Sequence, residues 1–539
     1  MNSGQPLVGP PSFARVAGSL WIWLYPMLGA AAIALATHPF TLSQLGWVAT
    51  LPLFYAWIRT TGDGRRGAGR RAFASGFWFG FVLLLAIAPW FAGFSPTGYP
   101  VGAICWGVLF GGSGVVLRLI LRRTSAIWVA PCLASAWILL EWVRSIGTLV
   151  FPWAVLSVTQ FTNLPVLQLL DLTGAFGLSG LMALFAAAAA QALWGLSATD
   201  PHTPERGSDA RFWGIRWLTA AAVILVLATI RGVYILSLPP RPGESFDVAI
   251  VQASESHRPS GIAVVCISPF GDYLRLTRDA AAGSPDFRGG PDRPDLIVWG
   301  ECASVPDIAQ DRGARSAVAT MLAGSEAQAL IGSFVTDPED GQTTNAAVLL
   351  SNDGNVLDRY DKVMIVPFGE YLPWRPYLGW TIALGMPEED LRAGPAFRPV
   401  TWSRGKIGVC ICFESAFPRV TRALTRNGAD VLAILTSDGW TSRELAGLQH
   451  YAFAALRAVE TRRTVIRAAV TGESAVLDPY GRVLARLPMF EKGVLRSPVR
   501  RSDEQSLYVR LGDWPLVLGA AILVAAAVTA VRSQRPATD

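Results

Sequence analysis

Charged residues are scarce in this chain of 539 residues: Asp, Glu, Lys and Arg make up 16% of it, whereas a soluble domain carries about 25%. Hydrophobic residues make up 51%. This composition argues against one large soluble enzyme. It also argues against a disordered chain, which needs low hydrophobicity and high charge. We therefore expect a membrane protein with a soluble portion attached.

The chain also has few of the residues that hold metals or read nucleic acids. Its six cysteines form no CxxC pair, so the common zinc spacings are absent. The best basic cluster, Arg65–Arg66 with Arg70–Arg71, lies between apolar stretches and has no nucleic-acid-binding motif beside it. We interpret that cluster as a signal for membrane topology, and we expect no nucleic-acid partner.

Apolar stretches of about 20 residues, the length that crosses a bilayer, recur through the chain. Seven precede residue 240 and an eighth lies near the C-terminus; the second is short. They cover residues 16–36, 43–58, 73–94, 101–121, 126–143, 167–194, 214–236 and 514–531. The sequence therefore predicts a membrane domain at 1–239, a soluble domain at 240–510, and a final membrane helix with a short tail at 511–539.

Arginine is concentrated before the first apolar stretch and after each even-numbered one. These residues are Arg15, Arg65, Arg66, Arg70, Arg71, Arg118, Arg122, Arg123, Arg206, Arg211, Arg216, Arg532 and Arg535. The loops after the third and fifth stretches hold only Arg144. Loops rich in Lys and Arg stay in the cytoplasm. Both termini should therefore be cytoplasmic, and residues 240–510 should lie outside the cytoplasmic membrane.

Within residues 240–510, short apolar runs rich in β-branched residues alternate with helical stretches, which predicts strands and helices in turn. The predicted strands lie at 246–254, 295–301, 327–334, 345–362, 406–415, 429–440 and 464–485, and helices include 314–324 and 445–463. The run at 345–362 contains Asn-Asp-Gly-Asn, a hairpin signal. The alternation predicts an α/β fold or a four-layer α-β-β-α sandwich.

Three chemically competent residues follow apolar strands: Glu301, Lys362 and Cys412. A cysteine needs a base or a nearby cation to form a thiolate at neutral pH. Glu301 could take the thiol proton, and Lys362 could stabilise a developing oxyanion. A single Glu or Lys at a strand end is usually solvated, however, and a buried Cys usually packs as a small apolar residue. Spacing alone therefore does not establish a triad.

Two questions stay open on the residues alone. Cys410 and Cys412 face the same side of a strand, so alternation cannot choose between them. A histidine usually supplies the base for a catalytic cysteine, but His257 and His450 are the only histidines of the soluble domain. A Cys–His pair is therefore weakly supported.

Longer motifs surround these residues. Trp-Gly-Glu ends at Glu301, VPFGEYLP (366–373) follows Lys362, and Cys412 begins Cys-Phe-Glu. Further motifs are EWVR (141–144), FPW (151–153), TSDGW (436–440), QH (449–450) and RAVE (457–460). Together they resemble the apolipoprotein N-acyltransferases, the membrane-bound branch of the nitrilase, or carbon-nitrogen hydrolase, superfamily. The resemblance covers nearly the whole chain, and the VPFGEYLP block is highly specific.

The resemblance implies a nitrilase-like α-β-β-α domain that transfers an acyl chain. A phospholipid would donate its sn-1 chain to Cys412 as a thioester, with Glu301 as general base and Lys362 stabilising the oxyanion. The α-amine of the N-terminal S-diacylglyceryl cysteine of an apolipoprotein would then attack the thioester and become an amide. Glu370 and Glu414 match supporting carboxylates of the family.

The same resemblance implies the setting of the enzyme. It would be a multi-pass protein of the inner membrane, with its catalytic domain on the periplasmic side. It would act as a monomer among membrane lipids, with no cofactor and no metal. The aromatic run at 366–384 predicts a lid or substrate contact at the bilayer surface, since Trp and Tyr prefer that interface. Its candidate residues are Tyr371, Trp374, Tyr377 and Trp380, and Trp440 is a further candidate.

The chain departs from the family pattern in places. Phe413 stands where a Tyr is common, residues 257–270 lack a Trp that is often present, and Ser437-Asp438-Gly439 replaces Asn-Asp-Ala. These differences leave substrate preference open. The main alternative is a membrane-anchored amidase or nitrilase, in which water attacks the thioester. A transporter or channel is a third reading, but ionisable residues within the apolar stretches are too few to support it.

Overall fold

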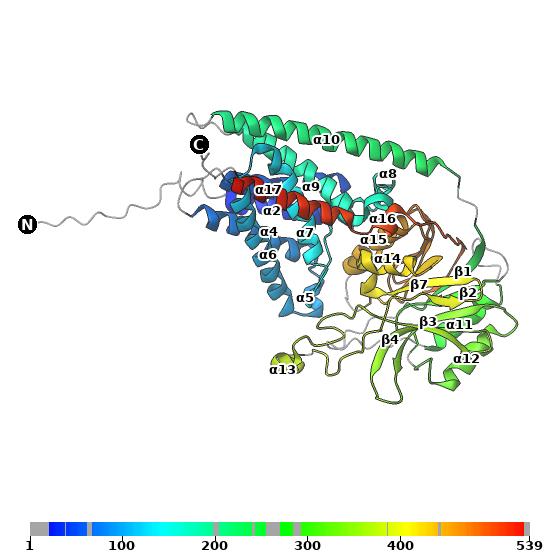
Figure 1. Cartoon of the computed structure of the whole chain (residues 1–539). Coiled ribbons are helices and arrows are strands. Elements are labelled where there is room, and N and C mark those ends of the chain that lie inside the picture. The colour runs from blue at the N-terminus through cyan, green and yellow to red at the C-terminus, as the bar shows by residue number, and fades with distance from the viewer. Residues whose placement is uncertain are drawn as a thin grey trace, which may run out of the picture.

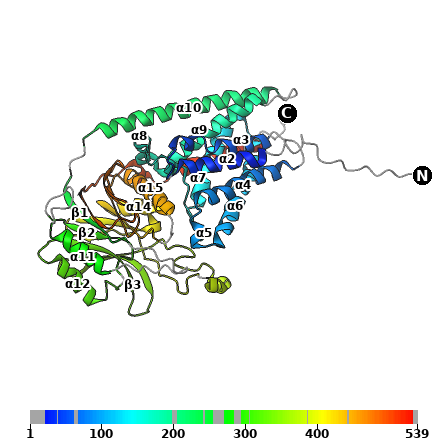
Figure 2. The ribbon, with the colours of Figure 1, turned by 180° about the vertical axis from the view of Figure 1, so that it is seen from behind.

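Apolar helices form the N-terminal part of the molecule, and two β-sheets form most of the remainder (Figure 1). The structure is a computed structural model. It describes residues 21–37, 39–61, 67–197, 204–239, 243–254, 270–283, 293–304, 306–384, 386–439 and 444–532. Viewed from behind, the same division holds, and α10 runs along the bundle toward strand β1 (Figure 2).

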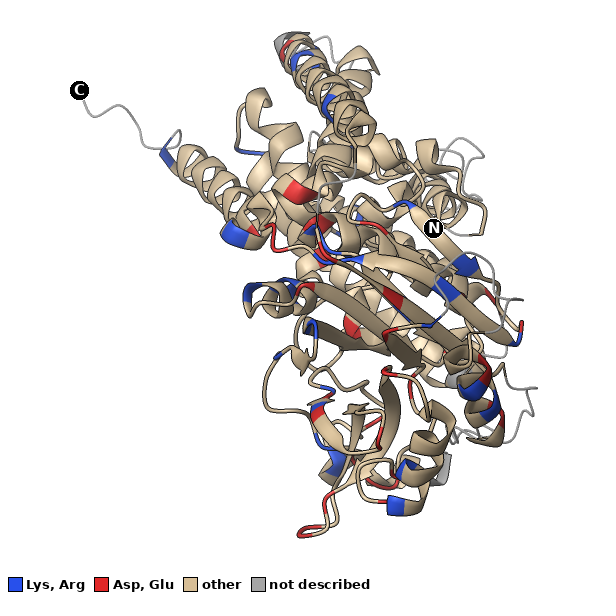
Figure 3. Cartoon of the chain, turned by 90° about the vertical axis from the view of Figure 1, so that its right-hand side faces the viewer, with Lys and Arg blue, Asp and Glu red and all other residues tan. Residues whose placement is uncertain are grey.

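Six helices in the described ranges are long and apolar enough to cross a membrane. They are α4 (Ala68–Ile87), α6 (Gly98–Leu121), α7 with its 3₁₀ turn (Ala126–Val143), α9 (Leu170–Ser197), α10 (Pro204–Ser237) and α17 (Trp514–Arg532). Charged residues are sparse along these helices (Figure 3). Large apolar side chains such as Leu227, 60% exposed, lie on their outward faces. Such a surface suits lipid rather than water.

The first two predicted stretches differ from full spans. Helix α2 (Trp21–Ala36) has 16 described residues. The stretch at 43–58 forms a 3₁₀ helix, η1 (Ser43–Trp47), and then α3 (Leu51–Thr61). With 11 residues, α3 is only about 16 Å long, too short to cross the membrane. Pro52 explains the break, because proline has no N–H for a helical hydrogen bond and is tolerated only in the first turn. The prediction of a continuous second span was wrong.

The soluble part is a sandwich of two six-stranded sheets. The first has the order β12-β1-β2-β3-β4-β5, and the second has the order β11-β10-β9-β8-β7-β6. The first comprises β12 (Gly493–Arg500), β1 (Ser245–Gln252), β2 (Leu296–Trp299), β3 (Gln328–Thr336), β4 (Thr343–Leu350) and β5 (Val356–Asp361). The second comprises β11 (Val483–Leu487), β10 (Ser474–Leu477), β9 (Val465–Ala469), β8 (Val431–Thr436), β7 (Gly405–Ile411) and β6 (Val400–Trp402). In each, three central strands are parallel and the outer pairs are antiparallel.

Side-chain alternation along the strands builds the layers. On β1, Val248 and Ile250 pack with the second sheet, whereas Ala249 and Val251 pack with helices α11 (Phe270–Ala281) and α12 (Arg312–Leu322). Helices α14 (Pro418–Arg426) and α15 (Glu444–Thr461) contact the second sheet. The order is helix, sheet, sheet, helix, so the predicted α-β-β-α architecture is confirmed.

A bend in α9 helps to join the two parts. Gly174 has φ 63°, and a Cβ there would lie 2.4 Å from the Tyr508 ring, so only glycine fits this position. The non-helical residue interrupts the hydrogen-bond ladder of α9. The freed N–H of Ala175 donates to Glu460 Oε1 of α15 at 2.8 Å. The membrane helix is thus hydrogen-bonded directly to the soluble domain.

A buried charge cluster makes a second connection. Asp171 of α9 accepts from Arg231 of α10 at 2.7 Å and from Arg462, at the end of α15, at 2.6 Å. Gln168 Oε1 also accepts from Arg462, at 2.7 Å, while its Nε2 donates to the backbone of Tyr480 at 2.9 Å. Removing Asp171 would leave the guanidinium of Arg462, only 3% exposed, without its carboxylate.

We predict that Asp171→Asn destabilises the folded protein by about 3 kcal/mol, because one partner of a buried pair stays charged. Thermal unfolding in detergent measures this loss. The control, Asp340→Asn, breaks an exposed pair with Arg392 and should cost about 0–1 kcal/mol. Equal unfolding temperatures for the two variants would show that the cluster does not hold the domains together.

Candidate active site

Polar side chains from both sheets meet at the ends of the strands. Glu301 follows β2, Lys362 follows β5, Cys412 follows β7, and Ser437 follows β8. Strands β1 and β2 contact β9 across the sandwich, and β4 contacts β7. Residues more than a hundred positions apart in sequence therefore converge on one buried site.

The Lys362 amine lies between two carboxylates. Its Nζ donates to Glu370 Oε1 at 2.7 Å and to Glu301 Oε1 at 3.3 Å. The lysine side chain is 1% exposed, and those of Glu301 and Glu370 are 8% and 14% exposed. Burial alone would lower the pKa of Lys362, but Glu370, Glu301 and Cys412 together raise it well above its usual value. The amine therefore stays positively charged in the resting site.

Asn345 ties the two carboxylates to each other. Its Nδ2 donates to Glu301 Oε1 at 2.9 Å and to Glu370 Oε1 at 3.1 Å. The backbone N–H of Ser437 donates to the second oxygen of Glu301 at 3.1 Å, and that of Val366 does the same for Glu370 at 2.7 Å. Sequence reasoning missed Asn345. Its only signal was a polar amide near the start of a buried apolar strand.

Cys412 leaves strand β7 in an unusual conformation. Its φ is 51°, in the left-handed region that a residue with a side chain seldom adopts. Such strain, of order 1–3 kcal/mol, is concentrated at active sites. The Cys412 thiol is buried: burial and the Glu301 carboxylate raise its pKa well above the usual range, although the Lys362 cation lowers it. At neutral pH the thiol keeps its proton, so a reaction requires a base that removes it during attack.

The left-handed conformation of Cys412 gives it different surroundings from Cys410. Cys410 stays within β7, 0% exposed, and its charged neighbours are Glu414 and Arg457. Cys412 instead interacts electrostatically with Glu301, Lys362 and Asp438. The strand alternation that left the two cysteines equivalent ends at Ile411, so only Cys412 lies among the polar residues of the site.

The two supporting carboxylates have different contacts. Glu370 binds the Lys362 amine directly. Glu414 is fully buried and accepts from the backbone N–H groups of Val363 and Met364, at 2.8 and 3.0 Å, and of Ile411 at 2.8 Å. Glu414 therefore joins the chain after Lys362 to the chain before Cys412. Within the described residues it makes no hydrogen bond to the Lys362 amine itself.

The predicted lid residues lie on a projecting segment. Short helices α13 (Arg375–Leu378) and η4 (Gly379–Leu384) extend from the sandwich (Figure 1). Trp374, Tyr377 and Trp380 are 51%, 81% and 68% exposed. These three aromatics therefore do not pack into a core. Tyr371, next to Glu370 in sequence, is half-buried. Trp440 and residues 257–269 lie outside the described residues.

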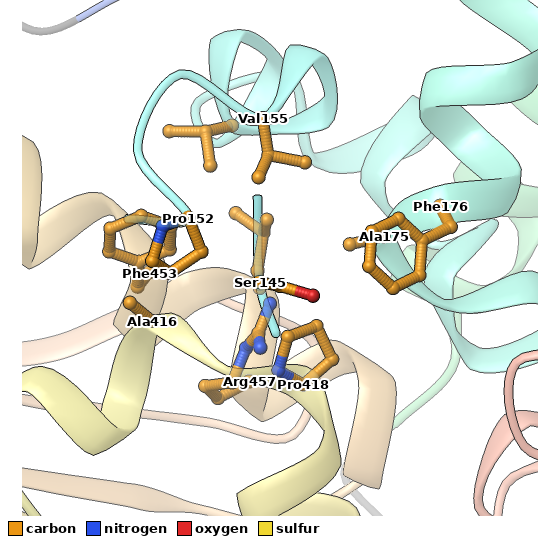
Figure 4. Close-up of a pocket in the computed structure, with 11 residues that line it drawn as sticks. Ser145, Pro152, Val155, Ala175, Phe176, Ala416, Pro418, Phe453 and Arg457 are labelled. Carbon is orange, nitrogen blue, oxygen red and sulfur yellow. The ribbon is translucent and has the colours of Figure 1, made fainter. Parts of the chain in front are cut away.

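A small cavity lies behind the turn that begins at Cys412, between the membrane helices and the soluble domain (Figure 4). Its lining is mostly apolar and comes from both parts of the chain: Ser145, Pro152, Val155, Val158, Ala175, Phe176, Ala416, Pro418, Phe453, Leu456 and Arg457. Ala416 ends η5 (Cys412–Ala416), the helical turn that begins at the cysteine. The membrane domain therefore forms one wall behind the site.

Two family models match the chain in different regions. Residues 294–508 match the family described as carbon-nitrogen hydrolase, and residues 29–188 match the N-terminal domain of apolipoprotein N-acyltransferase. An apolipoprotein N-acyltransferase of Geobacter metallireducens is 30% identical over 522 residues, covering 94% of this chain and 95% of that protein. The chain belongs to the apolipoprotein N-acyltransferase family.

Another relative agrees with this membership. Apolipoprotein N-acyltransferase 2 of Treponema denticola is 28% identical, covering 84% of this chain and 87% of the relative. Among solved structures, a carbon-nitrogen hydrolase from Helicobacter pylori is 16% identical, with a TM-score of 0.35, covering 51% of this chain and 95% of that one. The family membership confirms the predicted acyltransferase class. With the six apolar helices, it also makes this N-acyltransferase a multi-pass membrane protein.

The charges around Cys412 predict how the pKa of its thiol changes in variants, and thiol alkylation measures this change without any acyl transfer. Glu301→Gln removes a negative charge that raises the thiol pKa, so the thiolate forms at lower pH. One unit of pKa would make iodoacetamide alkylation about tenfold faster at a fixed pH below the pKa. Lys362→Met should slow alkylation, because the cation lowers the thiol pKa. The alkylation rate of Cys412 is measured after subtracting the rate in the Cys412→Ala variant. Slower alkylation in Glu301→Gln than in wild type would contradict this electrostatic account.

Proposed function

We propose that this protein transfers a fatty acyl chain from a phospholipid to the N-terminal S-diacylglyceryl cysteine of an apolipoprotein, through a thioester on Cys412. The observation that carries the proposal is the buried Cys412 beside a charged Lys362 and a Glu301 carboxylate, in a chain of the N-acyltransferase family. The mechanism requires no metal or soluble cofactor.

In the first step, Glu301 takes the Cys412 proton as the sulfur attacks the sn-1 ester carbonyl. The carbonyl oxygen becomes negative, and the Lys362 ammonium stabilises it. The tetrahedral intermediate collapses as the ester C–O bond breaks and the leaving alkoxide takes a proton from Glu301. A thioester and a lysophospholipid result. Glu370 keeps Lys362 charged and in place through the 2.7 Å contact.

In the second step, the α-amine of the lipoprotein attacks the thioester. Glu301 takes the amine proton, Lys362 again stabilises the oxyanion, and the C–S bond breaks to give an amide and the Cys412 thiolate, which is reprotonated. The covalent intermediate divides one acyl transfer into two easier steps. It also lets two lipid-anchored substrates use the same site in turn.

The arrangement of the domains supports a lipid substrate. The site lies where the sandwich meets the apolar bundle, so acyl chains can remain within lipid while their head groups reach Cys412. A soluble amide, the substrate of the alternative amidase reading, would not need this bundle. We propose that the sandwich faces the periplasm, as the arginine-rich cytoplasmic loops indicate.

Cysteine variants test the nucleophile. We predict that Cys412→Ala abolishes N-acylation of a diacylglyceryl peptide, and that Cys412→Ser is nearly inactive because an alkoxide forms far less readily than a thiolate. Cys410→Ala is the matched control, two residues away, and should keep most of the activity. Mass spectrometry of the peptide measures the product; full activity in Cys412→Ala would refute the assignment.

Labelling tests the orientation of the sandwich. A cysteine placed at Ser351, in the turn between β4 and β5, should react with a membrane-impermeant maleimide in intact spheroplasts. A cysteine placed at Thr61, at the end of α3, should react only after permeabilisation. The reverse pattern would overturn the proposed orientation and the lipoprotein substrate with it.

The exposed aromatics predict a selective defect. Trp374→Ala and Trp380→Ala should slow transfer from a long-chain phospholipid severalfold, because a lid gates entry of the lipid. Acylation by a short soluble ester, and alkylation of Cys412, should remain normal. Leu357→Ala, which removes an exposed apolar side chain from β5, is the control. Equal losses with both acyl donors would show that these aromatics do not form a lid.

A further inference from the structure

His450 is a buried ionisable residue that the two-step scheme does not use. It lies on α15 and is 4% exposed. Its Nδ1 is 2.8 Å from Asp438 Oδ1, while its Nε2 is 3.0 Å from the backbone oxygen of Cys412 and 2.7 Å from Ser415 Oγ. Arg467 Nη2 donates to the other oxygen of Asp438 at 2.7 Å. The network therefore ends on the backbone of the nucleophile.

The partners determine where the protons lie. Burial would raise the pKa of Asp438, but Arg467 and His450 lower it well below its usual value, so its carboxylate only accepts. Nδ1 of His450 therefore donates to Asp438. The Cys412 carbonyl also only accepts, so Nε2 donates to it when the ring carries both protons, as an imidazolium paired with the Asp438 carboxylate. Ser415 Oγ donates to the same carbonyl oxygen at 2.9 Å. Two side chains thus hold one carbonyl.

This carbonyl needs support because the backbone around it is strained. Cys412 has φ 51°. The cavity of Figure 4 lies against Ala416 and Pro418, at the far end of the same turn. All five residues of η5 are buried, and hydrogen bonds from His450 and Ser415 hold the Cys412 carbonyl within this turn.

Because the peptide is planar, fixing the Cys412 carbonyl also fixes the direction of the N–H that follows it. In a trans peptide the C=O and the following N–H point in opposite directions. The carbonyl of Cys412 is held toward His450, so the N–H of Phe413 faces the opposite side. Phe413 lies in the first turn of η5, where helical geometry provides no acceptor for its N–H. Within the described residues this N–H has no hydrogen-bond acceptor, so it can meet an oxygen bound at Cys412.

We propose that His450 is a positioning residue for acyl transfer: it holds the Cys412 carbonyl so that the Phe413 N–H joins Lys362 in stabilising the acyl oxyanion. The inference rests on the proposed function. The membrane domain supports this histidine, because the Trp153 ring lies 5.9 Å from the His450 ring. Trp153 is fixed in turn by its Nε1, which donates to Gln449 at 2.8 Å.

The test compares two replacements at the same position. His450→Gln keeps an amide N–H that can reach the Cys412 carbonyl, whereas His450→Leu keeps the bulk and removes the donor. With a short soluble ester, we expect kcat for acylation to fall about 10–100-fold in His450→Leu, with KM unchanged, as for a lost oxyanion donor. His450→Gln should restore kcat to within about threefold of wild type. Unfolding temperatures are recorded for each variant.

Thr461→Val provides the control on the same helix. It removes a buried hydrogen bond to the Arg457 carbonyl, 2.7 Å long, and should lower stability without changing kcat. If His450→Leu does not fold, Ser415→Ala removes the other donor, and its kcat should fall with KM unchanged. A normal kcat in His450→Leu, or in Ser415→Ala where that variant is used instead, overturns the inference. Equal losses of kcat in His450→Leu and His450→Gln also overturn it. If wild type itself forms no acyl-enzyme, the proposed function fails instead.

Discussion

The buried ammonium of Lys362 is the constraint on which the site depends. An isolated buried charge would be too costly to keep, so the fold must bring carboxylates to it. Glu301 and Glu370 do so from the end of β2 and from the loop after β5, and Asn345 holds both of them. Both carboxylates raise the pKa of the lysine and keep it charged, while burial and Glu301 raise the pKa of the Cys412 thiol and keep it protonated. One buried cluster therefore sets the protonation states that the chemistry requires.

The membrane helices contribute to this arrangement. Asp171 binds Arg462 from the bundle side, and the freed N–H of Ala175 binds Glu460. Gln449 accepts from the indole N–H groups of Trp90 and Trp153. These contacts converge on α15 and the residue after it, and α15 also carries His450, which contacts the Cys412 carbonyl. The bundle therefore both faces lipid and supports the turn that begins at Cys412.

Local patterns in the sequence predicted much of this. Short apolar runs rich in β-branched residues located most strands of the sandwich, though not β6 or β12. Motif resemblance brought Glu301, Lys362 and Cys412 together. The prediction of a continuous second span was wrong because apolar composition alone does not show the break near Pro52. Cys410 and Cys412 could not be separated, since the left-handed φ of Cys412 is a tertiary feature. Asn345 and His450 act through partners 12 to 44 residues away in sequence, and no local pattern predicts such contacts.

The central claim is an acyl-enzyme on Cys412 that passes its chain to an amine. The most direct measurement is intact-mass analysis of the purified protein during a single turnover with phospholipid. The account predicts a mass increase of one fatty acyl chain, removable by mild hydroxylamine. It also predicts that adding a diacylglyceryl peptide discharges the adduct into N-acylated peptide. Absence of the adduct, or its discharge as free fatty acid with the peptide unchanged, would contradict the account.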